Sequence, residues 1–172
     1  MRKTSAALVT ALAIAMSAAP VVAQDADSAE IDEVRAVTAT YSWLPNALDA
    51  GYVPLTGEDP DVPLCVDSDA GGMGLHYLRN VDGVADATDP EAIMYSVAED
   101  GSTTLVAVEY VVPQPFVEDE DGNVVALPSV LGQDLQLNPD LGLYTLHAWI
   151  WEENPDGMFA DFNPAVAPCP TA

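Results

Sequence analysis

Residues 103–112 read TTLVAVEYVV, and this stretch does most to decide what fold the chain can form. Its β-branched and aromatic side chains favour a strand over a helix. Working outward, runs rich in Val, Tyr, Ile and Trp predict three more strands, at residues 74–78, 92–97 and 143–151. The sequence EDG at residues 99–101 is typical of a tight turn, so the strands at 92–97 and 103–112 should form a hairpin.

The residues after this hairpin are more polar and richer in turn formers. A second hairpin is indicated within residues 116–127, where the acidic run EDEDGN at 118–123 lies between apolar pairs. We expect residues 128–142 to form a long loop. Because the strands follow one another with short turns, the sheet should be mainly antiparallel.

Ahead of the strands, the apolar period changes to that of a helix. Apolar residues recur at three- and four-residue steps: Ile31, Val34, Val37, Tyr41 and Leu44. Pro45 interrupts this pattern, residues 45–50 can add a further turn or two, and Gly51 supplies a stop. The sequence therefore predicts an α+β fold, with an N-terminal amphipathic helix packed on a mainly antiparallel, curled or barrel-like β-sheet.

The charge balance excludes several classes of partner. The 172 residues include 28 Asp and Glu but only 4 Lys and Arg, which gives a formal net charge of −24. Nucleic acids and anionic membrane surfaces attract basic proteins, so we expect neither to bind this chain. With 49% hydrophobic residues, the chain is nevertheless apolar enough to fold around a core.

The first 23 residues have the pattern of a secretory signal peptide. Arg2 and Lys3 are followed by an apolar stretch at residues 6–16, which is too short to span a bilayer, and by a small-residue cleavage site ending at Ala23. We therefore expect a secreted or periplasmic protein without membrane insertion. Its mature part, residues 24–172, should form a single globular domain.

Removing the signal peptide makes the charge more extreme. The mature chain has no lysine, and its only basic side chains other than histidine are Arg35 and Arg79, so its formal charge is 2 − 28 = −26. Self-repulsion of this size destabilises a folded protein at low ionic strength and is screened by salt. We therefore expect saline or halophilic surroundings.

The mature chain contains two cysteines, Cys65 and Cys169. In an oxidising compartment an even pair is typical of a disulfide, which here would tie the C-terminal end to the body of the domain. A pair of metal-binding or catalytic thiols is the alternative.

Histidine is scarce, and both copies fall in predicted strands. His76 follows a glycine-rich run, His147 lies within LYTLHAWIW, and Glu109 interrupts the apolar stretch quoted above. One interpretation is that the histidines are hydrogen-bonded core residues and that Glu109 pairs with Arg79 or with a tyrosine. The other is that His76, Glu109 and His147 converge and bind a divalent metal ion such as zinc or iron, or perform acid–base chemistry.

Other sites of chemistry find little support in the sequence. The acidic runs at residues 67–72 and 119–123 both lack the glutamate that ends an EF-hand loop, and the second also has its glycine at the fourth position instead of the sixth, so we interpret both as solvated turns. The chain has no GxSxG, no GxGxxG and no phosphate-binding P-loop. Without lysine, the mature chain is unable to form a Schiff base. The aromatic residues suit either an apolar pocket or plain core: Tyr41, Trp43, Tyr77, Tyr110, Tyr144, Trp149 and Trp151.

Several stretches, taken together, resemble a family of uncharacterised exported bacterial proteins. They include GMGLHY at residues 72–77, PEAIMY at 90–95, LVAVEY at 105–110, LHAWIW at 146–151 and NPDGMF at 154–159, with both cysteines. The resemblance covers nearly the whole mature chain and places His76, Glu109 and His147 within recognisable segments. It implies no activity.

These observations favour an exported acidic domain of α+β class. Our leading hypothesis is that it binds a small ligand or a metal ion in an aromatic-lined pocket near His76, Glu109 and His147. The alternatives are a metal-dependent or acid–base enzyme that uses the same residues, or an envelope protein-interaction module in which the histidines are structural.

Overall fold

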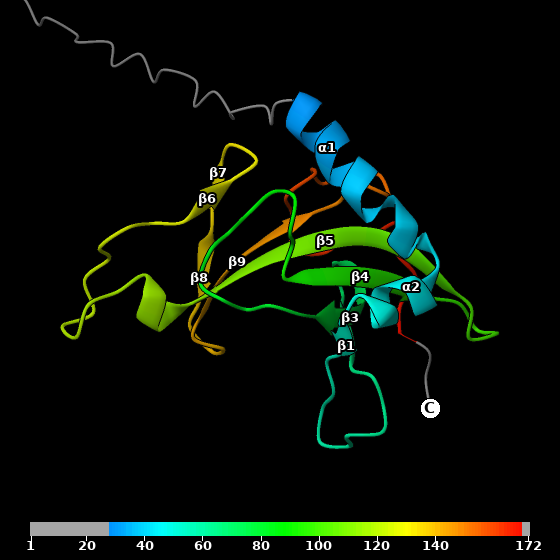
Figure 1. The fold of residues 1–172 in the computed structure, drawn as a ribbon. Helices are drawn as coiled ribbons and strands as arrows, with labels where there is room; N and C mark the ends of the chain where they lie inside the picture. The colour runs from blue at the N-terminus through cyan, green and yellow to red at the C-terminus, as the bar shows by residue number, and fades with distance from the viewer. Residues whose placement is uncertain (1–27, 170–172) are drawn as a thin grey trace, which may run out of the picture.

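The computed structural model describes residues 28–169, so the expected signal peptide at residues 1–23 lies outside the described residues. This part of the chain begins with helices and continues as strands (Figure 1). The helical elements are α1 (Ser28–Thr38), η1 (Ala39–Ser42), α2 (Leu44–Asp49) and η2 (Gln114–Phe116). The strands are β1 (Val53–Pro54), β2 (Cys65–Ser68), β3 (Gly71–Leu78), β4 (Ala92–Val97), β5 (Thr103–Pro113), β6 (Ser129–Val130), β7 (Gln133–Asp134), β8 (Gln136–Asn138) and β9 (Leu143–Ala148).

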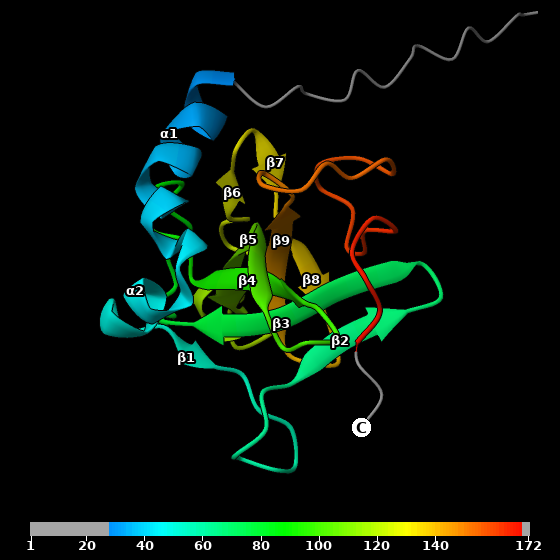
Figure 2. The same cartoon turned by 90° about the vertical axis from the view of Figure 1, so that its right-hand side faces the viewer.

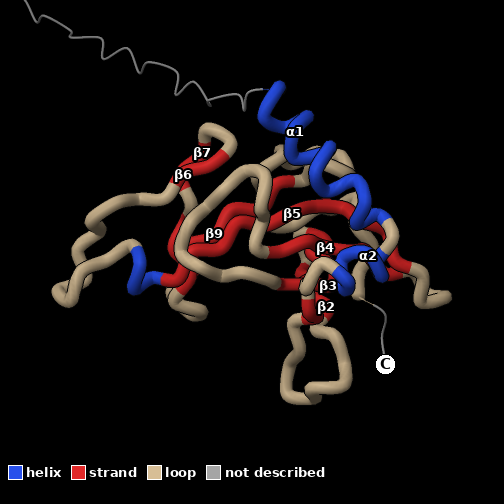
Figure 3. The backbone as a smooth tube through the Cα atoms, viewed as in Figure 1, coloured by secondary structure: helices blue, strands red, loops and turns tan. Residues whose placement is uncertain are grey.

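The main sheet is antiparallel at every pairing and follows the order β1-β3-β4-β5-β9-β8, with β2 also paired to β3. The α+β class and the antiparallel sheet are thus confirmed. The path has two ends, so the sheet is open and the expected closure into a barrel is not confirmed. Strands β6 and β7 form a separate small sheet (Figure 3).

The helices and the C-terminal segment, residues 152–169, lie on opposite sides of the main sheet (Figure 2). On the helix side, α1 and α2 pack on the large core, to which the sheet contributes Tyr77, Ile93, Tyr95, Val108, Tyr110, Val112, Tyr144, Leu146 and Ala148. On the other side, a smaller buried cluster contains Met94, Val106, Ala107, Trp149 and Val166. The sheet is therefore buried on both faces, and its two faces are chemically different.

The first helix is shorter than the apolar spacing predicts. α1 ends at Thr38 and buries Ile31, Val34 and Thr38, whereas Val37 is exposed. After the 3-10 turn, α2 begins at Leu44 with Pro45 in its first turn, where the missing N–H of proline costs nothing. The helix at residues 45–50 is thereby confirmed, and Gly51, with a φ of +91°, follows its end.

The strands predicted at residues 92–97 and 103–112 and the turn between them are confirmed, but two other predictions are wrong in part. The strand expected at residues 143–151 ends at Ala148, because the backbone N–H of Trp149 bonds to Met158 and that of Trp151 bonds back to Val106. Residues 128–142, expected to be a loop, contain the short strands β6, β7 and β8.

The C-terminal segment is fixed to the sheet by a disulfide and by backbone hydrogen bonds. Cys65 of β2 is bonded to Cys169, as the cysteine count predicts. Asn163 exchanges two backbone hydrogen bonds with Gly72 of β3, and the N–H of Cys169 donates to the Asp67 carboxylate. Within residues 28–169, no helix has the length and hydrophobicity needed to cross a membrane.

Candidate metal centre

Three strands bring His76, Glu109 and His147 to the face of the sheet that the C-terminal segment covers. Glu109 of β5 lies directly opposite His147 of β9 and also opposite Ala92 of β4. His76 of β3 pairs with Met94, which lies on the same face two residues from Ala92. Directly paired residues share a face, so the three polar side chains converge above β4. The convergence predicted from the sequence is what the structure contains.

The ligating atoms of the three side chains lie close together. His76 Nε2 is 3.8 Å from Glu109 Oε2, and His147 Nε2 is 3.5 Å from Glu109 Oε1. One ligating atom from each residue lies within 4.8 Å of the other two. Ligands of a tetrahedral zinc ion, at 2.0–2.1 Å from the metal, are about 3.3 Å apart, so a small inward movement of the side chains is enough to bind one.

The site is buried and incompletely hydrogen-bonded. The three side chains are exposed by only 6–11%. His76 Nδ1 and both ring nitrogens of His147 are buried without a hydrogen-bond partner. Buried polar atoms are almost always paired, and an unpaired group in a native protein calls for an explanation such as a bound ion. This geometry therefore contradicts the interpretation in which both histidines are hydrogen-bonded core residues.

The two imidazoles have different electrostatic surroundings. Burial lowers the pKa of His76, and the negative charge of Glu109 offsets only part of that effect. Burial also acts to lower the pKa of His147, but the carboxylates of Glu109 and Asp161 outweigh it, so this pKa is raised. His76 is therefore neutral at pH 7 and has the lone pair that a metal ion needs.

Within residues 28–169, Asp161 is a further acidic side chain at this site. Its Oδ1 atom lies 3.8 Å from His147 Nδ1, on the side of the ring that faces away from Glu109. This separation is too long for a direct hydrogen bond but short enough for strong electrostatic attraction. His147 accordingly lowers the pKa of Asp161.

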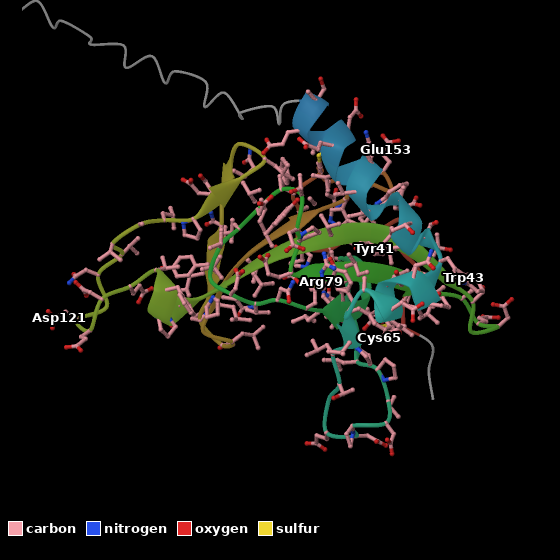
Figure 4. The ribbon with its side chains drawn as sticks, viewed as in Figure 1. Tyr41, Trp43, Cys65, Arg79, Asp121 and Glu153 are labelled. Atoms are coloured by element: carbon pink, nitrogen blue, oxygen red, sulfur yellow. A yellow bond between two sulfur atoms is a disulfide. The ribbon has the colours of Figure 1, made fainter. Side chains whose placement is uncertain are left out.

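The predicted pairing of Glu109 with Arg79 or a tyrosine is wrong. Arg79 forms an ion pair with Asp89 instead and lies over the ring of Tyr52, on the helix side of the sheet. Figure 4 shows Arg79 next to Tyr41 there, and the guanidinium carbon is 5.8 Å from the centre of that ring. Strand alternation explains the error, because Arg79 is three residues after His76 and therefore points to the opposite face, the one that Tyr77 occupies.

The expected aromatic lining is also wrong for most of the residues proposed. Tyr77, Tyr110 and Tyr144 pack in the large core on the opposite face. Tyr77 and Tyr110 directly follow His76 and Glu109 in their strands, and consecutive strand residues point to opposite faces. Trp43 is 65% exposed, and of the aromatic residues named only Trp149 lies in the buried cluster on the site's face.

A surface hollow of about 490 Å³ lies near the C-terminal segment but does not include the three residues. It is lined by Arg35, Trp149, Ile150, Trp151, Glu152, Glu153, Asn154 and Met158. Because its three side chains are only 6–11% exposed, the candidate site is a buried cluster of potential ligands.

The acidic turn at residues 118–123 lies in a loop that projects from one side of the molecule, with Asp121 at its tip (Figure 4). The Asp119 carboxylate accepts hydrogen bonds from the backbone of Asp121 and from Asn123. These bonds are those of an ordinary Asx turn, as the sequence suggests.

Two carboxylates of the structure, Asp161 and Glu91, were not predicted from the sequence to face the site or to be buried. Asp161 lies in a loop 14 residues after His147, and no spacing rule links the two. Glu91 immediately precedes β4 and is 2% exposed, with its carboxylate accepting a hydrogen bond from the N–H of Val111. Its position before the apolar run AIMYSV is the only sequence signal that it is buried.

Comparisons with known proteins add no functional assignment. No protein-family model matches the chain, and searches of curated proteins and of solved structures find no match either. The interpretation of the site therefore rests on its own geometry.

Proposed function

We propose that the protein binds a divalent transition-metal ion between His76, Glu109 and His147, and that zinc suits this donor set best. The observation that carries the proposal is the burial of three potential ligand atoms within 4.8 Å of one another, beside imidazole nitrogens that lack partners. Two histidines and one carboxylate are a common zinc ligand set, and imidazole nitrogens also bind copper and iron.

Binding explains the site better than turnover does. Three protein ligands leave a fourth coordination position, which a metal-dependent enzyme would use for substrate. Here the ligands are nearly inaccessible, and the hollow nearby is lined by other residues. We therefore favour metal binding over the enzyme and over the interaction module, which would leave the unpaired imidazole nitrogens unexplained.

Export to a secreted or periplasmic location is part of the same proposal. The Cys65–Cys169 disulfide supports it, because disulfides persist in oxidising compartments and are rare in the cytosol. The resemblance to exported bacterial proteins agrees with this location but adds no activity.

The test is a metal titration of the mature protein after chelator treatment. We expect one zinc or cobalt ion per chain, with cobalt giving the visible spectrum of a low-symmetry site. His147→Ala and Glu109→Gln should each weaken binding by at least a hundredfold, because each removes one of three ligands. Glu120→Gln removes the same charge from an exposed position and is the matched control.

This control matters because 28 acidic side chains attract cations without any specific site. Nonspecific attraction would disappear in molar NaCl and would be the same in His147→Ala and Glu120→Gln. Equal affinities for these two variants and the wild type would refute the proposal.

A further inference from the structure

We infer that Asp161 is a positioning residue, which holds His147 in the tautomer and orientation needed to bind the metal ion. This inference rests on the proposed function. The imidazole lies between two carboxylates, with Nε2 facing Glu109 and Nδ1 facing Asp161. The first carboxylate is in the ligand set and the second is outside it.

The chemistry of neutral imidazole assigns different roles to the two nitrogens. A histidine that binds a metal through Nε2 carries its proton on Nδ1, and this N–H needs an acceptor when the ring is buried. The Nδ1 atom of His147 is buried and unpaired, and Asp161 Oδ1 is 3.8 Å away. A shift of about 1 Å would bring the carboxylate to hydrogen-bond distance. Metal-binding histidines usually donate to such a carboxylate.

The backbone on both sides of Asp161 is fixed independently of any metal ion. The carbonyl of Ala160 accepts a hydrogen bond from Trp149 Nε1, and the carbonyl of Phe162 accepts one from Asn154 Nδ2. Asn163, two residues after Asp161, is paired with Gly72 of β3. These bonds hold Asp161 beside His147 while leaving its side chain free to turn toward the ring.

The charge of the site favours the same assignment. A zinc ion with two neutral imidazoles and the Glu109 carboxylate has a net charge of 2 − 1 = +1, which is costly to bury. Asp161 adds −1 and makes the group neutral. Its side chain is 77% exposed, so it keeps its own hydration and is ionised without a large desolvation cost. Asp161 is outside the ligand set because it faces Nδ1 of His147, whereas Glu109 faces Nε2.

The test compares Asp161→Ala and Asp161→Asn with the control Asp156→Ala, which removes an exposed aspartate from the same segment. We expect Asp161→Ala to lower zinc affinity 10- to 100-fold in a chelator competition, the range measured for partners of this kind. Asp161→Asn should lose less, because its amide oxygen still accepts from Nδ1–H. Asp156→Ala should bind within twofold of the wild type.

Two spectroscopic measurements separate positioning from other roles. The cobalt spectrum should keep its shape in Asp161→Ala, because the ligand set is unchanged. Nitrogen chemical shifts of His147 in the zinc-loaded wild type should show the proton on Nδ1. The metal-free Asp161→Ala protein should still unfold in one cooperative transition, as Asp156→Ala does, which excludes a general loss of folding.

Each contrary result has a distinct meaning. A wild type that binds metal, with Asp161→Ala binding equally well, would overturn the role of Asp161 alone. A changed cobalt spectrum in Asp161→Ala would also overturn it, because Asp161 would then be a ligand. A wild type that binds no metal would refute the proposed function and this inference with it.

Discussion

At the scale of single residues, Glu91 is a buried carboxylate with a structural task. The pairing of β4 with β5 ends at Ala92, which lies opposite Glu109. Val111, two residues further along β5, therefore has no backbone partner in β4 for its N–H group. The Glu91 side chain takes the place of the missing strand and accepts the hydrogen bond of Val111 at 2.9 Å. Burial raises the pKa of Glu91 to about 7, and the Val111 hydrogen bond offsets only part of this rise.

This raised pKa predicts that Glu91 destabilises the fold as the pH rises. In the unfolded chain the Glu91 carboxyl group loses its proton near pH 4.5, whereas in the folded protein it keeps the proton up to about pH 7. Stability contributed by Glu91 is therefore complete below pH 4.5 and lost between pH 4.5 and 7. The loss amounts to about 3 kcal/mol. Glu91→Gln keeps the hydrogen-bond acceptor and should flatten this part of the pH profile.

Urea unfolding at pH 4.5 and pH 8 measures the effect. Glu120→Gln, at an exposed position, should retain the wild-type difference between the two pH values. A Glu91→Gln profile identical to that of the wild type would show that Glu91 titrates normally in the folded protein.

The residues of the candidate site were predictable to the extent that their surroundings in the sequence are unusual. His76, Glu109 and His147 are polar side chains in apolar strands, and such residues need a partner once they are buried. Asp161 was not predictable in this way, because it comes from an irregular loop whose path depends on Trp149 and Asn163.

At the scale of elements, the path of β3 depends on Gly74. Its φ is +87°, and a Cβ atom at this position would lie 2.3 Å from the carbonyl oxygen of Tyr95 in β4. No side chain fits there without moving β3 from β4, and β3 carries His76 two residues later. The glycines ahead of His76 therefore allow this strand to approach its neighbour closely.

Gly74→Ala should consequently cost about 3 kcal/mol or more, combining backbone strain with overlap. Gly101→Ala is the matched control, because Gly101 has a similar φ of +81° but nothing within 4 Å of its Cβ position. The control should lose only about 1–2 kcal/mol from backbone strain. Urea unfolding of both variants measures the difference, and equal losses would contradict the close packing of β3 on β4.

The elements that the sequence predicts well are those with a strong local pattern. β4 and β5 have long apolar runs and a clear turn between them, and they match the prediction closely. β1, β6, β7 and β8 have two or three residues each, too few for a period to be visible. The end of β9 depends on Met158 and Val106, which are remote in sequence, so local residues carry no signal for it.

At the scale of the whole molecule, the disulfide determines how firmly the C-terminal segment closes over the sheet. Cys65 and Cys169 are 104 residues apart, and a cross-link closing a loop of this length stabilises a fold by up to roughly 4–5 kcal/mol in the chain-entropy model. A Cys65→Ser, Cys169→Ser double variant should lose stability of this order, since the unfolded chain regains its freedom.

Chemical unfolding with and without reductant measures this loss. Reductant should destabilise the wild type and leave the double variant unaffected, which serves as the internal control. A double variant as stable as the oxidised wild type would mean that the hydrogen bonds of Asn163 and Cys169 hold the segment without the cross-link.

The short outer strands have a consequence for how copies of this protein behave toward one another. β8 at one end of the sheet has three residues, and β1 and β2 share the other end with two and four. An exposed strand edge recruits the backbone of a second molecule, and a short edge offers few bonds for such pairing. In concentrated salt, where repulsion between acidic surfaces is screened, this geometry still opposes cross-β aggregation. Resistance to aggregation therefore depends on the shortness of the edge strands as well as on the net charge of the protein.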